Sequence, residues 1–290
     1  MASEPRHAIG VDVGGTRIRI ARVREDATLD GHRIEPVERG REAFAAQLTR
    51  LVASVRNDGA VGVGIGIPGR VRDGTVLSAG YLDIAGLDLP ALVRDAADLP
   101  ARVENDAAMA LVAEASLRED VARGTIAILT VGTGIGGAVA VNGRPWHGGG
   151  LAGQFGHIAV AADGPPCNCG ARGCVETLSS GTALGRILSE HGLPSGITAT
   201  EVLDRAEAGE ARCRAVVEEW ARPFTRAVAT LSATIDPDLV IVGGGLGTEM
   251  VRALARLPEP SAWFDVPVEA ARLGDDAGVT GAGLAALDAR

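Results

Sequence analysis

Residues 146–176 read WHGGGLAGQFGHIAVAADGPPCNCGARGCVE and contain a dense group of metal-binding side chains. His157 is followed ten residues later by the first of three cysteines, Cys167, Cys169 and Cys174. Three thiolates and one imidazole suit tetrahedral zinc, and the glycines and prolines between them let a short chain wrap around one ion. Because four protein ligands leave no open coordination position, the sequence predicts a structural Zn²⁺ rather than a catalytic one.

The alternative for these cysteines is burial or disulfide pairing. Cys167 and Cys169 are separated by one residue, which is a poor disulfide geometry because neighbouring Cα–Cβ vectors diverge. Cys213 lies alone in a helical pattern, and we expect it to be buried and unreactive. Metal-like cysteine spacing favours a reducing, cytoplasmic location over a secreted disulfide scaffold.

The same stretch resembles the ROK family, whose name stands for repressors, open reading frames and sugar kinases. The family carries a G-E-x-G-H element followed by C-x-C-G-x-x-G-C-x-E, and here residues 153–157 read GQFGH and residues 167–176 read CNCGARGCVE. The second match is complete, whereas Gln154 replaces the usual Glu in the first. The resemblance implies that Gln154, His157 and Glu176 bind a sugar, with one nitrogen of His157 on the sugar and the other on zinc.

Two strand–glycine turn–strand patterns occur far apart in the chain. In residues 9–20, an apolar β-branched run stops at a glycine pair, and apolar residues then return at alternate positions, which predicts a β-hairpin. Residues 125–141 repeat this plan around a second glycine-rich turn. A plain Gly-Gly hairpin is the alternative for the first pattern. The repeat suggests two duplicated domains that hold one nucleotide between them.

The first hairpin also resembles the D-x-G-G-T phosphate element of actin- and hexokinase-like ATPases. Glycines there let backbone N–H groups approach phosphate closely, and Asp12 can hold a metal-bound water or orient the magnesium of the nucleotide. A third glycine turn, after a strand at residues 238–242, corresponds in the family to the adenosine contact. The resemblance therefore implies nucleotide contacts at Asp12, Gly14, Gly15, Thr16, Arg17, Gly132, Thr133, Gly134, Gly244 and Gly245.

A predicted strand at residues 101–104 leads to Asn105 and Asp106 at the start of a predicted helix, residues 107–117. An aspartate at a helix start is usually an N-cap. Here, however, E-N-D-A matches the element in which ROK kinases place the catalytic base. The resemblance implies that Asp106 accepts the proton of an attacking hydroxyl and that Asn105 pairs with sugar hydroxyls.

A Pro-Gly-Arg turn follows the predicted buried strand at residues 61–67. In the family the backbone of this turn lies beside the sugar, so the resemblance implies that Gly69 and Arg70 contact the substrate. Arg70 reaches sugar or phosphate in this interpretation. The alternative is a solvated turn arginine.

The fold class that we predict is α/β, with two ribonuclease-H-like domains of the actin/hexokinase type and an active-site cleft between them. The smaller domain comprises residues 1–117 and 279–290, with the first phosphate hairpin and Asp106. The larger domain comprises residues 118–278, with the second hairpin, the zinc loop and the adenosine turn.

The bulk composition limits the possible partners. The chain has 290 residues and a formal net charge of −9, and all 28 of its cationic side chains are arginines. Nucleic acid is disfavoured because no basic stripe is visible. Seven residues precede Ala8, too few for the DNA-binding domain of ROK repressors. We also expect no membrane span and no signal peptide. A homodimer is the family's habit.

The function that we predict is an ATP-dependent sugar kinase that uses ATP and Mg²⁺ to phosphorylate the 6-hydroxyl of a hexose or amino sugar. N-acetylmannosamine is slightly favoured over glucose, because the Gln154 amide can pair with an N-acetyl carbonyl and because residues 78–82 lack the asparagine that glucokinases carry there. A non-catalytic sugar sensor without a DNA-binding domain is the alternative. Loss of zinc is expected to weaken sugar binding and to spare the ATP contacts, which lie in another segment.

Overall fold

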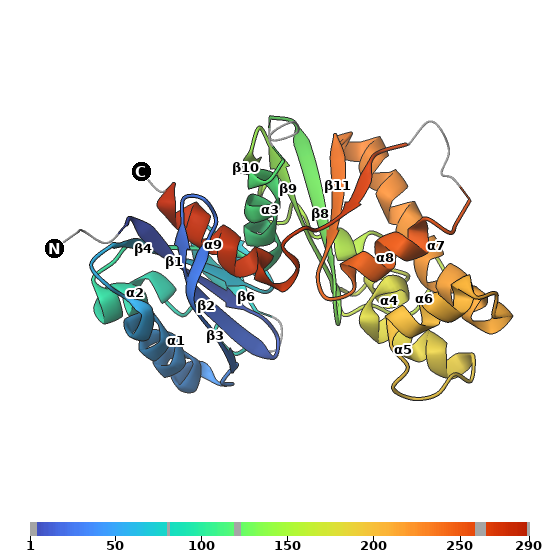
Figure 1. Cartoon of the computed structure of the whole chain (residues 1–290), viewed down its shortest axis with the longest axis horizontal. Coiled ribbons are helices and arrows are strands. Elements are labelled where there is room, and N and C mark those ends of the chain that lie inside the picture. Colours follow the sequence, from blue (N-terminus) through green and yellow to red (C-terminus); the bar gives the residue numbers. More distant parts are fainter. Residues whose placement is uncertain (1–4, 80–81, 119–122, 259–264, 289–290) are drawn as a thin grey trace. The chain divides into compact units, whose positions relative to one another are not determined.

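The chain divides into two compact units in the computed structural model, which describes residues 5–79, 82–118, 123–258 and 265–288 (Figure 1). Unit 1 comprises Met1–Glu119, His147–Leu151 and Asp275–Arg290, and unit 2 comprises Asp120–Trp146 and Ala152–Gly274. These units are defined by packing alone, so the domain boundaries drawn from sequence motifs stay a prediction. No helix of the described residues has the length and apolar character needed to cross a bilayer.

Unit 1 is built on a five-stranded sheet with the order β3-β2-β1-β4-β7. Strands β1 and β2 form the predicted antiparallel hairpin, and β4 and β7 extend the sheet parallel to β1. The elements of this unit are β1 (His7–Val13), β2 (Arg17–Arg24), β3 (Leu29–Pro36), α1 (Arg41–Val55), β4 (Ala60–Ile67), β5 (Arg70–Arg72), β6 (Thr75–Ser78), α2 (Leu89–Ala97), β7 (Ala101–Asn105), α3 (Asp106–Ser116) and α9 (Ala277–Leu287), which the 3-10 turn η2 (Gly274–Asp276) precedes.

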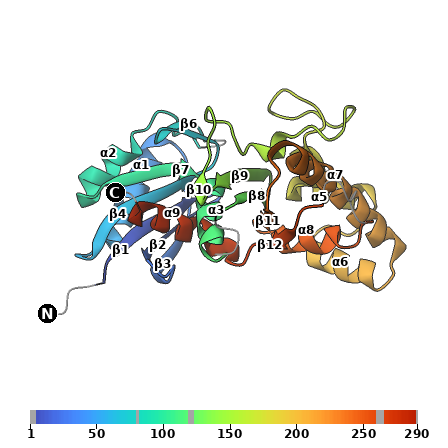
Figure 2. The same cartoon turned by 90° about the horizontal axis from the view of Figure 1, so that it is seen from above.

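The two faces of this sheet differ in side-chain size, because strand residues alternate between faces. Large residues such as Val11 and Ile65 face the core formed with α1 and α2. The other face carries glycines, and α9 lies directly on it (Figure 2). A Cβ at Gly10 would come within 2.0 Å of the Val279 carbonyl oxygen, and a Cβ at Gly64 within 1.8 Å of that of Ala282. Glycine is therefore required where the α9 backbone meets the sheet.

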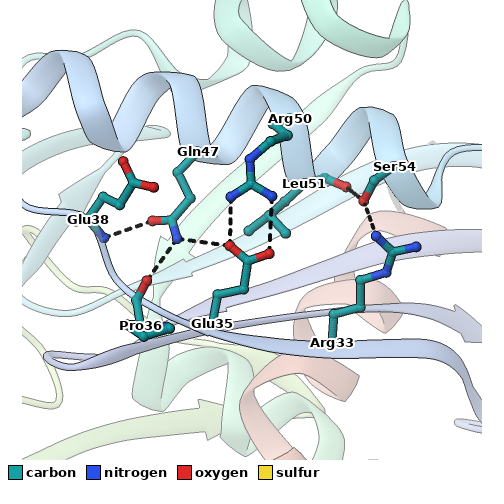
Figure 3. A network of polar contacts seen from close by, with 8 residues as sticks. All are labelled: Arg33, Glu35, Pro36, Glu38, Gln47, Arg50, Leu51 and Ser54. Atoms are coloured by element: carbon teal, nitrogen blue, oxygen red, sulfur yellow. Dashed lines mark hydrogen bonds and ion pairs between the residues drawn. The ribbon is translucent and has the colours of Figure 1, made fainter.

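Strand β3, which the sequence patterns did not predict, is joined to α1 by polar contacts (Figure 3). The buried Gln47 side chain accepts a hydrogen bond from the Glu38 N–H at 2.8 Å and donates one to the Pro36 carbonyl at 2.8 Å. Arg50 binds both carboxylate oxygens of Glu35, at 3.1 and 2.6 Å. Hydrogen bonds thus hold this edge strand, whose side chains are mostly exposed, against the helix.

Unit 2 repeats the plan of unit 1 with the strand order β10-β9-β8-β11-β12. Strands β8 and β9 form the second predicted hairpin, and β11 and β12 run parallel to β8. The elements are β8 (Thr125–Val131), β9 (Ile135–Val141), β10 (Arg144–Pro145), the 3-10 turn η1 (Phe155–His157), α4 (Val175–Ser179), α5 (Gly181–Glu190), α6 (Ala199–Glu207), α7 (Ala211–Ile235), β11 (Leu239–Gly243), α8 (Gly247–Leu254) and β12 (Val268–Ala270).

The core of unit 2 forms around α7. Trp220 and Phe224 are buried in it, together with Leu129 and Val131 of β8. Cys213 is also fully buried here, as expected from its place in a helical pattern. This α/β arrangement with paired hairpin sheets confirms the predicted fold class.

Candidate active site

Two carboxylates lie at the same edge of the unit 1 sheet. Asp12 is near the end of β1, in register with Gly66 of β4, and Asp106 begins α3 directly after β7. Parallel strands bring their carboxyl ends to one edge, so these residues meet there although they are far apart in sequence. Burial and then the charge of Asp106 raise the pKa of Asp12 from 3.8 to about 7. The surroundings at this edge therefore oppose the ionisation of Asp12.

Arg19 is a component of this site that sequence reasoning missed. It is the cross-strand partner of Asp12 in the first hairpin, and its Nη1 lies 3.5 Å from Asp12 Oδ2. Its Nη2 donates to Asp275 Oδ2 at 2.8 Å, and the Arg19 and Asp12 side chains are each only 13% exposed. The hairpin register, which follows from the predicted turn, could have revealed the Asp12–Arg19 pair. The contact with Asp275 lies too far along the chain to be read from a local pattern.

The N-cap of α3 is Asn105 rather than Asp106. Asn105 Oδ1 accepts hydrogen bonds from the N–H groups of Ala107 and Ala108, at 3.0 and 3.2 Å. The Asn105 Nδ2 donates to the Gly69 carbonyl at 3.0 Å. Asn105, and not Asp106, therefore caps the N-terminus of α3, the role that was the alternative for Asp106. Burial raises the pKa of Asp106, although the Ala107 N–H, which donates to Asp106 Oδ1 at 2.9 Å, lowers it in part.

The turn before β5 places Gly69 next to Asn105, and Arg70 follows Gly69. Gly69 has a φ of 96°, and a Cβ there would lie 2.4 Å from the Ser78 carbonyl oxygen, so only glycine fits. Arg70 begins β5 and its side chain is exposed. Residues 78–82 lack the asparagine that glucokinases carry there. Within this segment, Gly80 and Tyr81 lie outside the described residues.

The four predicted zinc ligands come together in unit 2. The ligand atoms of His157, Cys167, Cys169 and Cys174 all lie within 4.8 Å of one another. The Nδ1 atom of His157 is 3.5 Å from Cys167 Sγ, and Cys169 Sγ is 3.6 Å from Cys174 Sγ. Tetrahedral zinc with Zn–S bonds near 2.3 Å would separate its sulfur ligands by about 3.8 Å. The three cysteines of the cluster are free rather than disulfide-bonded, so the cluster fits a structural Cys3His zinc site.

The other residues of unit 2 that were predicted to bind a sugar lie next to this cluster in the sequence. Gln154 precedes the 3-10 turn that carries His157, and its carbonyl accepts from the His157 N–H at 3.1 Å. Because His157 Nδ1 faces the cysteines, Nε2 is the nitrogen left for another partner. Glu176 lies two residues after Cys174, and its Oε2 accepts from the Ile135 N–H at 2.9 Å. Glu176 is thus bound to the turn of the second hairpin.

The glycine turns of unit 2 are neighbours at the carboxyl ends of β8 and β11. Gly244 has a φ of 79°, and a Cβ on it would lie 2.6 Å from the Val131 carbonyl oxygen. The Leu246 N–H donates to the same carbonyl at 2.9 Å. The second hairpin turn, with Gly132, Thr133 and Gly134, therefore lies beside the turn with Gly244 and Gly245.

The first hairpin turn belongs to unit 1 and is closed by one hydrogen bond, from the Gly14 N–H to the Arg17 carbonyl at 2.8 Å. Thr16 and Arg17 are exposed at its tip, and Gly15 is half-buried. The residues predicted to bind the nucleotide thus lie in or beside three strand-end turns. Two of these turns are packed together within unit 2.

The family comparison agrees with this arrangement of motifs. The family model described as "ROK family" matches residues 8–289. The chain belongs to the ROK family. Among curated relatives, N-acetylmannosamine kinase of Escherichia coli O139:H28 is 34% identical over 288 residues, covering 96% of this chain and 97% of that protein. Glucokinase of Halalkalibacterium halodurans is 30% identical, with 96% and 94% covered.

A solved structure extends the comparison to three dimensions. The crystal structure of a ROK family glucokinase from Streptomyces griseus, in complex with glucose and AMPPNP, matches with a TM-score of 0.80. The two sequences are 29% identical, and the match covers 97% of this chain and 99% of that chain. The fold is therefore that of ROK hexokinases.

Proposed function

We propose that this protein is an ATP-dependent sugar kinase that transfers the γ-phosphate of ATP to the 6-hydroxyl of a hexose or amino sugar. The observation that carries the proposal is Asp106, a carboxylate released from capping by Asn105 and located at the strand-end edge beside Asp12. Burial raises its pKa, the direction that makes a carboxylate a better proton acceptor. The family relationship supports the same reaction class.

Each residue set has a distinct part in this reaction. Asp106 accepts the proton of the 6-hydroxyl as the oxygen attacks phosphorus. Backbone N–H groups of the glycine turns bind the phosphates, and Arg17 at the tip of the first turn contributes charge. Asp12 orients the hydrated Mg²⁺ of the nucleotide, which supplies charge neutralisation when bound. The turn with Gly244 and Gly245 contacts the adenosine.

In this proposal the sugar-binding residues are those named by the family motifs. They are Gly69, Arg70, Asn105, Gln154, His157 and Glu176. His157 presents Nε2 to the sugar while Nδ1 holds the structural zinc, which fits the orientation of its ring toward Cys167. The zinc site keeps His157 in place and takes no part in the chemistry.

N-acetylmannosamine is the substrate that we favour over glucose. Gln154 offers an amide N–H that pairs with an N-acetyl carbonyl, whereas the carboxylate usual at this position would repel that oxygen. Relatives named N-acetylmannosamine kinase are 33–34% identical and the relative named glucokinase is 30% identical. We also propose a cytoplasmic homodimer, in keeping with the family.

The test is ADP release in the presence of ATP, Mg²⁺ and a panel of hexoses and amino sugars. The wild type should release ADP only with an acceptor sugar. The Asp106→Asn variant keeps the size of the side chain and loses its basicity, so turnover should fall by roughly 10²-fold or more while sugar and ATP still bind. A protein that binds sugar without ADP release would instead be a sugar sensor, and near-normal turnover of the variant would remove Asp106 as the base.

A further inference from the structure

The turn of the second hairpin is hydrogen-bonded to the segment that follows the last cysteine of the cluster. Glu176 Oε2 accepts from the Ile135 N–H at 2.9 Å, and the Gly181 N–H donates to the Gly132 carbonyl at 2.7 Å. Thr182 Oγ1 donates to the Thr133 carbonyl at 2.8 Å. We call Glu176, Gly181 and Thr182 the turn clamp. Its three residues bind three successive parts of one short turn.

The contact between turn and clamp is close enough to require small residues. A Cβ at Gly134 would lie 2.4 Å from Glu176 Oε2, and a Cβ at Gly181 would lie 2.8 Å from the Gly132 carbonyl oxygen. Backbone meets backbone at Gly181 without an intervening side chain. The turn is therefore packed directly against residues 176–182.

The clamp also decides which backbone groups of the turn remain free. It occupies the carbonyls of Gly132 and Thr133. The N–H groups of Thr133 and Gly134 make no hydrogen bond within the described part of the chain. Successive free N–H groups in a turn form a concavity that binds anions such as phosphate. The clamp thus binds the carbonyls of this turn and leaves the N–H groups of Thr133 and Gly134 available.

The clamp is itself fixed at both ends. Cys174 lies immediately before α4, and the Val175 N–H donates to the Ile158 carbonyl at 2.9 Å, next to His157. At the other end, Trp220 Nε1 of α7 donates to the Ser180 carbonyl at 3.1 Å. The metal cluster holds the start of the clamp segment and the core of unit 2 holds its end.

We propose that the turn clamp positions the second phosphate turn, with Thr182 as a positioning residue, so that the metal cluster supports nucleotide binding as well as sugar binding. This inference rests on the proposed sugar kinase function. It reverses the expectation drawn from sequence, which separated the ATP contacts from the zinc loop because they are distant along the chain.

The first experiment compares Thr182→Val with Thr182→Ser in full-length, zinc-loaded protein. Calorimetric titration with Mg·AMPPNP, without sugar, reports nucleotide affinity directly. Valine keeps the side-chain shape and loses the hydroxyl, so the Kd should rise about 3- to 10-fold, the size expected for one lost neutral hydrogen bond. Serine keeps the hydroxyl and should bind as the wild type does. The KM for sugar at saturating ATP should not change in either variant.

The second experiment removes the metal from the cluster. Wild type treated with a chelator and the Cys169→Ser variant, whose substituted side chain is exposed, should both bind Mg·AMPPNP more weakly in the absence of sugar. Amide exchange should accelerate at residues 131–136 and stay unchanged in the β1–β2 hairpin of unit 1. That hairpin is the internal control for general unfolding.

The outcomes separate the inference from the proposed function. If wild type phosphorylates sugars while Thr182→Val and metal-free protein bind the nucleotide as wild type does, the clamp proposal is wrong and the kinase proposal stands. If wild type binds no nucleotide, the kinase proposal fails and the inference falls with it. Equal weakening by Thr182→Val and Thr182→Ser would show a packing effect and would also overturn the assignment of the hydroxyl.

Discussion

The two glycine-turn hairpins have the same topology and differ in how their turns are supported. When the last cross-strand pairs are aligned, Asp12 and Arg19 of the first hairpin correspond to Thr130 and Gly136 of the second. The first hairpin thus carries its own charged pair, tied to Asp275 before the final helix. The second is uncharged at these positions and takes its carboxylate, Glu176, from another segment. The two hairpins thus share a topology, but the carboxylate at the turn comes from the hairpin itself in the first and from another segment in the second.

The strands beneath the turns differ in the same way. Gly10 of β1 corresponds to Ile128 of β8 in this alignment, and both are fully covered. At Gly10 the backbone of α9 lies on the strand, whereas at Ile128 side-chain packing fills the space. The same hairpin topology therefore forms whether helix backbone or side chains pack on its first strand, and in both hairpins other segments contact the turn.

The largest effect is expected where the supports differ most, at Gly10. A Cβ there would lie 2.0 Å from the Val279 carbonyl, so Gly10→Ala must displace α9 and should lower the free energy of unfolding by about 3 kcal/mol or more. Ile128→Val at the matching position should cost about 0.5–1.5 kcal/mol. Urea unfolding measures both. Similar costs for the two variants would remove the distinction between backbone and side-chain support.

The second prediction concerns the charged pair of the first hairpin. Between pH 4 and 7 the folded protein holds a proton on Asp12 that the unfolded chain releases, since the pKa of Asp12 is raised from 3.8 to about 7. Stability from this group is therefore complete below pH 4 and is lost as pH rises to 7. Without divalent cations, Asp12→Asn should be more stable than wild type at pH 8, by about 1–4 kcal/mol, and equally stable near pH 4.

The control for that prediction is Thr130→Val in the second hairpin. It changes the corresponding position without removing a titrating group, so its effect on urea unfolding should be the same at pH 4 and pH 8. A stability difference for Asp12→Asn that also stays constant with pH would mean that Asp12 titrates normally in the folded protein.

The smallest expected effect is a change in sugar preference when the neutral Gln154 is replaced by a carboxylate. Gln154→Glu adds a carboxylate and removes an amide donor. If Gln154 sets the choice of sugar, the ratio of kcat/KM for N-acetylmannosamine to that for glucose should fall by the equivalent of about 1–3 kcal/mol. An unchanged ratio, or a strong wild-type preference for glucose, would place specificity elsewhere.

Much of the fold could be predicted from sequence because the hairpins and the metal cluster leave patterns in short stretches of the chain. Alternating apolar residues ending at a glycine turn predicted both hairpins, and ligand spacing predicted the cluster that the structure brings together. Strand β3 was missed because it is an edge strand with few buried side chains, which leaves no alternation to detect. Its stability comes from hydrogen bonds to α1 that only the folded chain reveals.

The site was less completely predictable than the fold. The assignment of Asn105 to the sugar stays a prediction. The sequence did not show that its side chain also caps α3 and binds the Gly69 carbonyl, a contact between residues that are distant in sequence. Arg19 and Thr182 were missed because their partners, Asp275 and Thr133, are brought close only by tertiary packing. Motifs indicate which residues carry chemistry, whereas the residues that hold them in place are found from contacts.

The glycine face covered by α9 has a consequence for folding during synthesis. The strands of unit 1 leave the ribosome early, yet α9 follows all of unit 2 in the chain. Until residues 277–287 emerge, Gly10 of β1 and Gly64 of β4 lack the backbone that packs on them, and Asp12 lacks its neighbour Gly278. Unit 2 has all its strands before that moment. The nascent chain should therefore complete its second unit first, and Asp12 should acquire its native surroundings only in the last stage of folding.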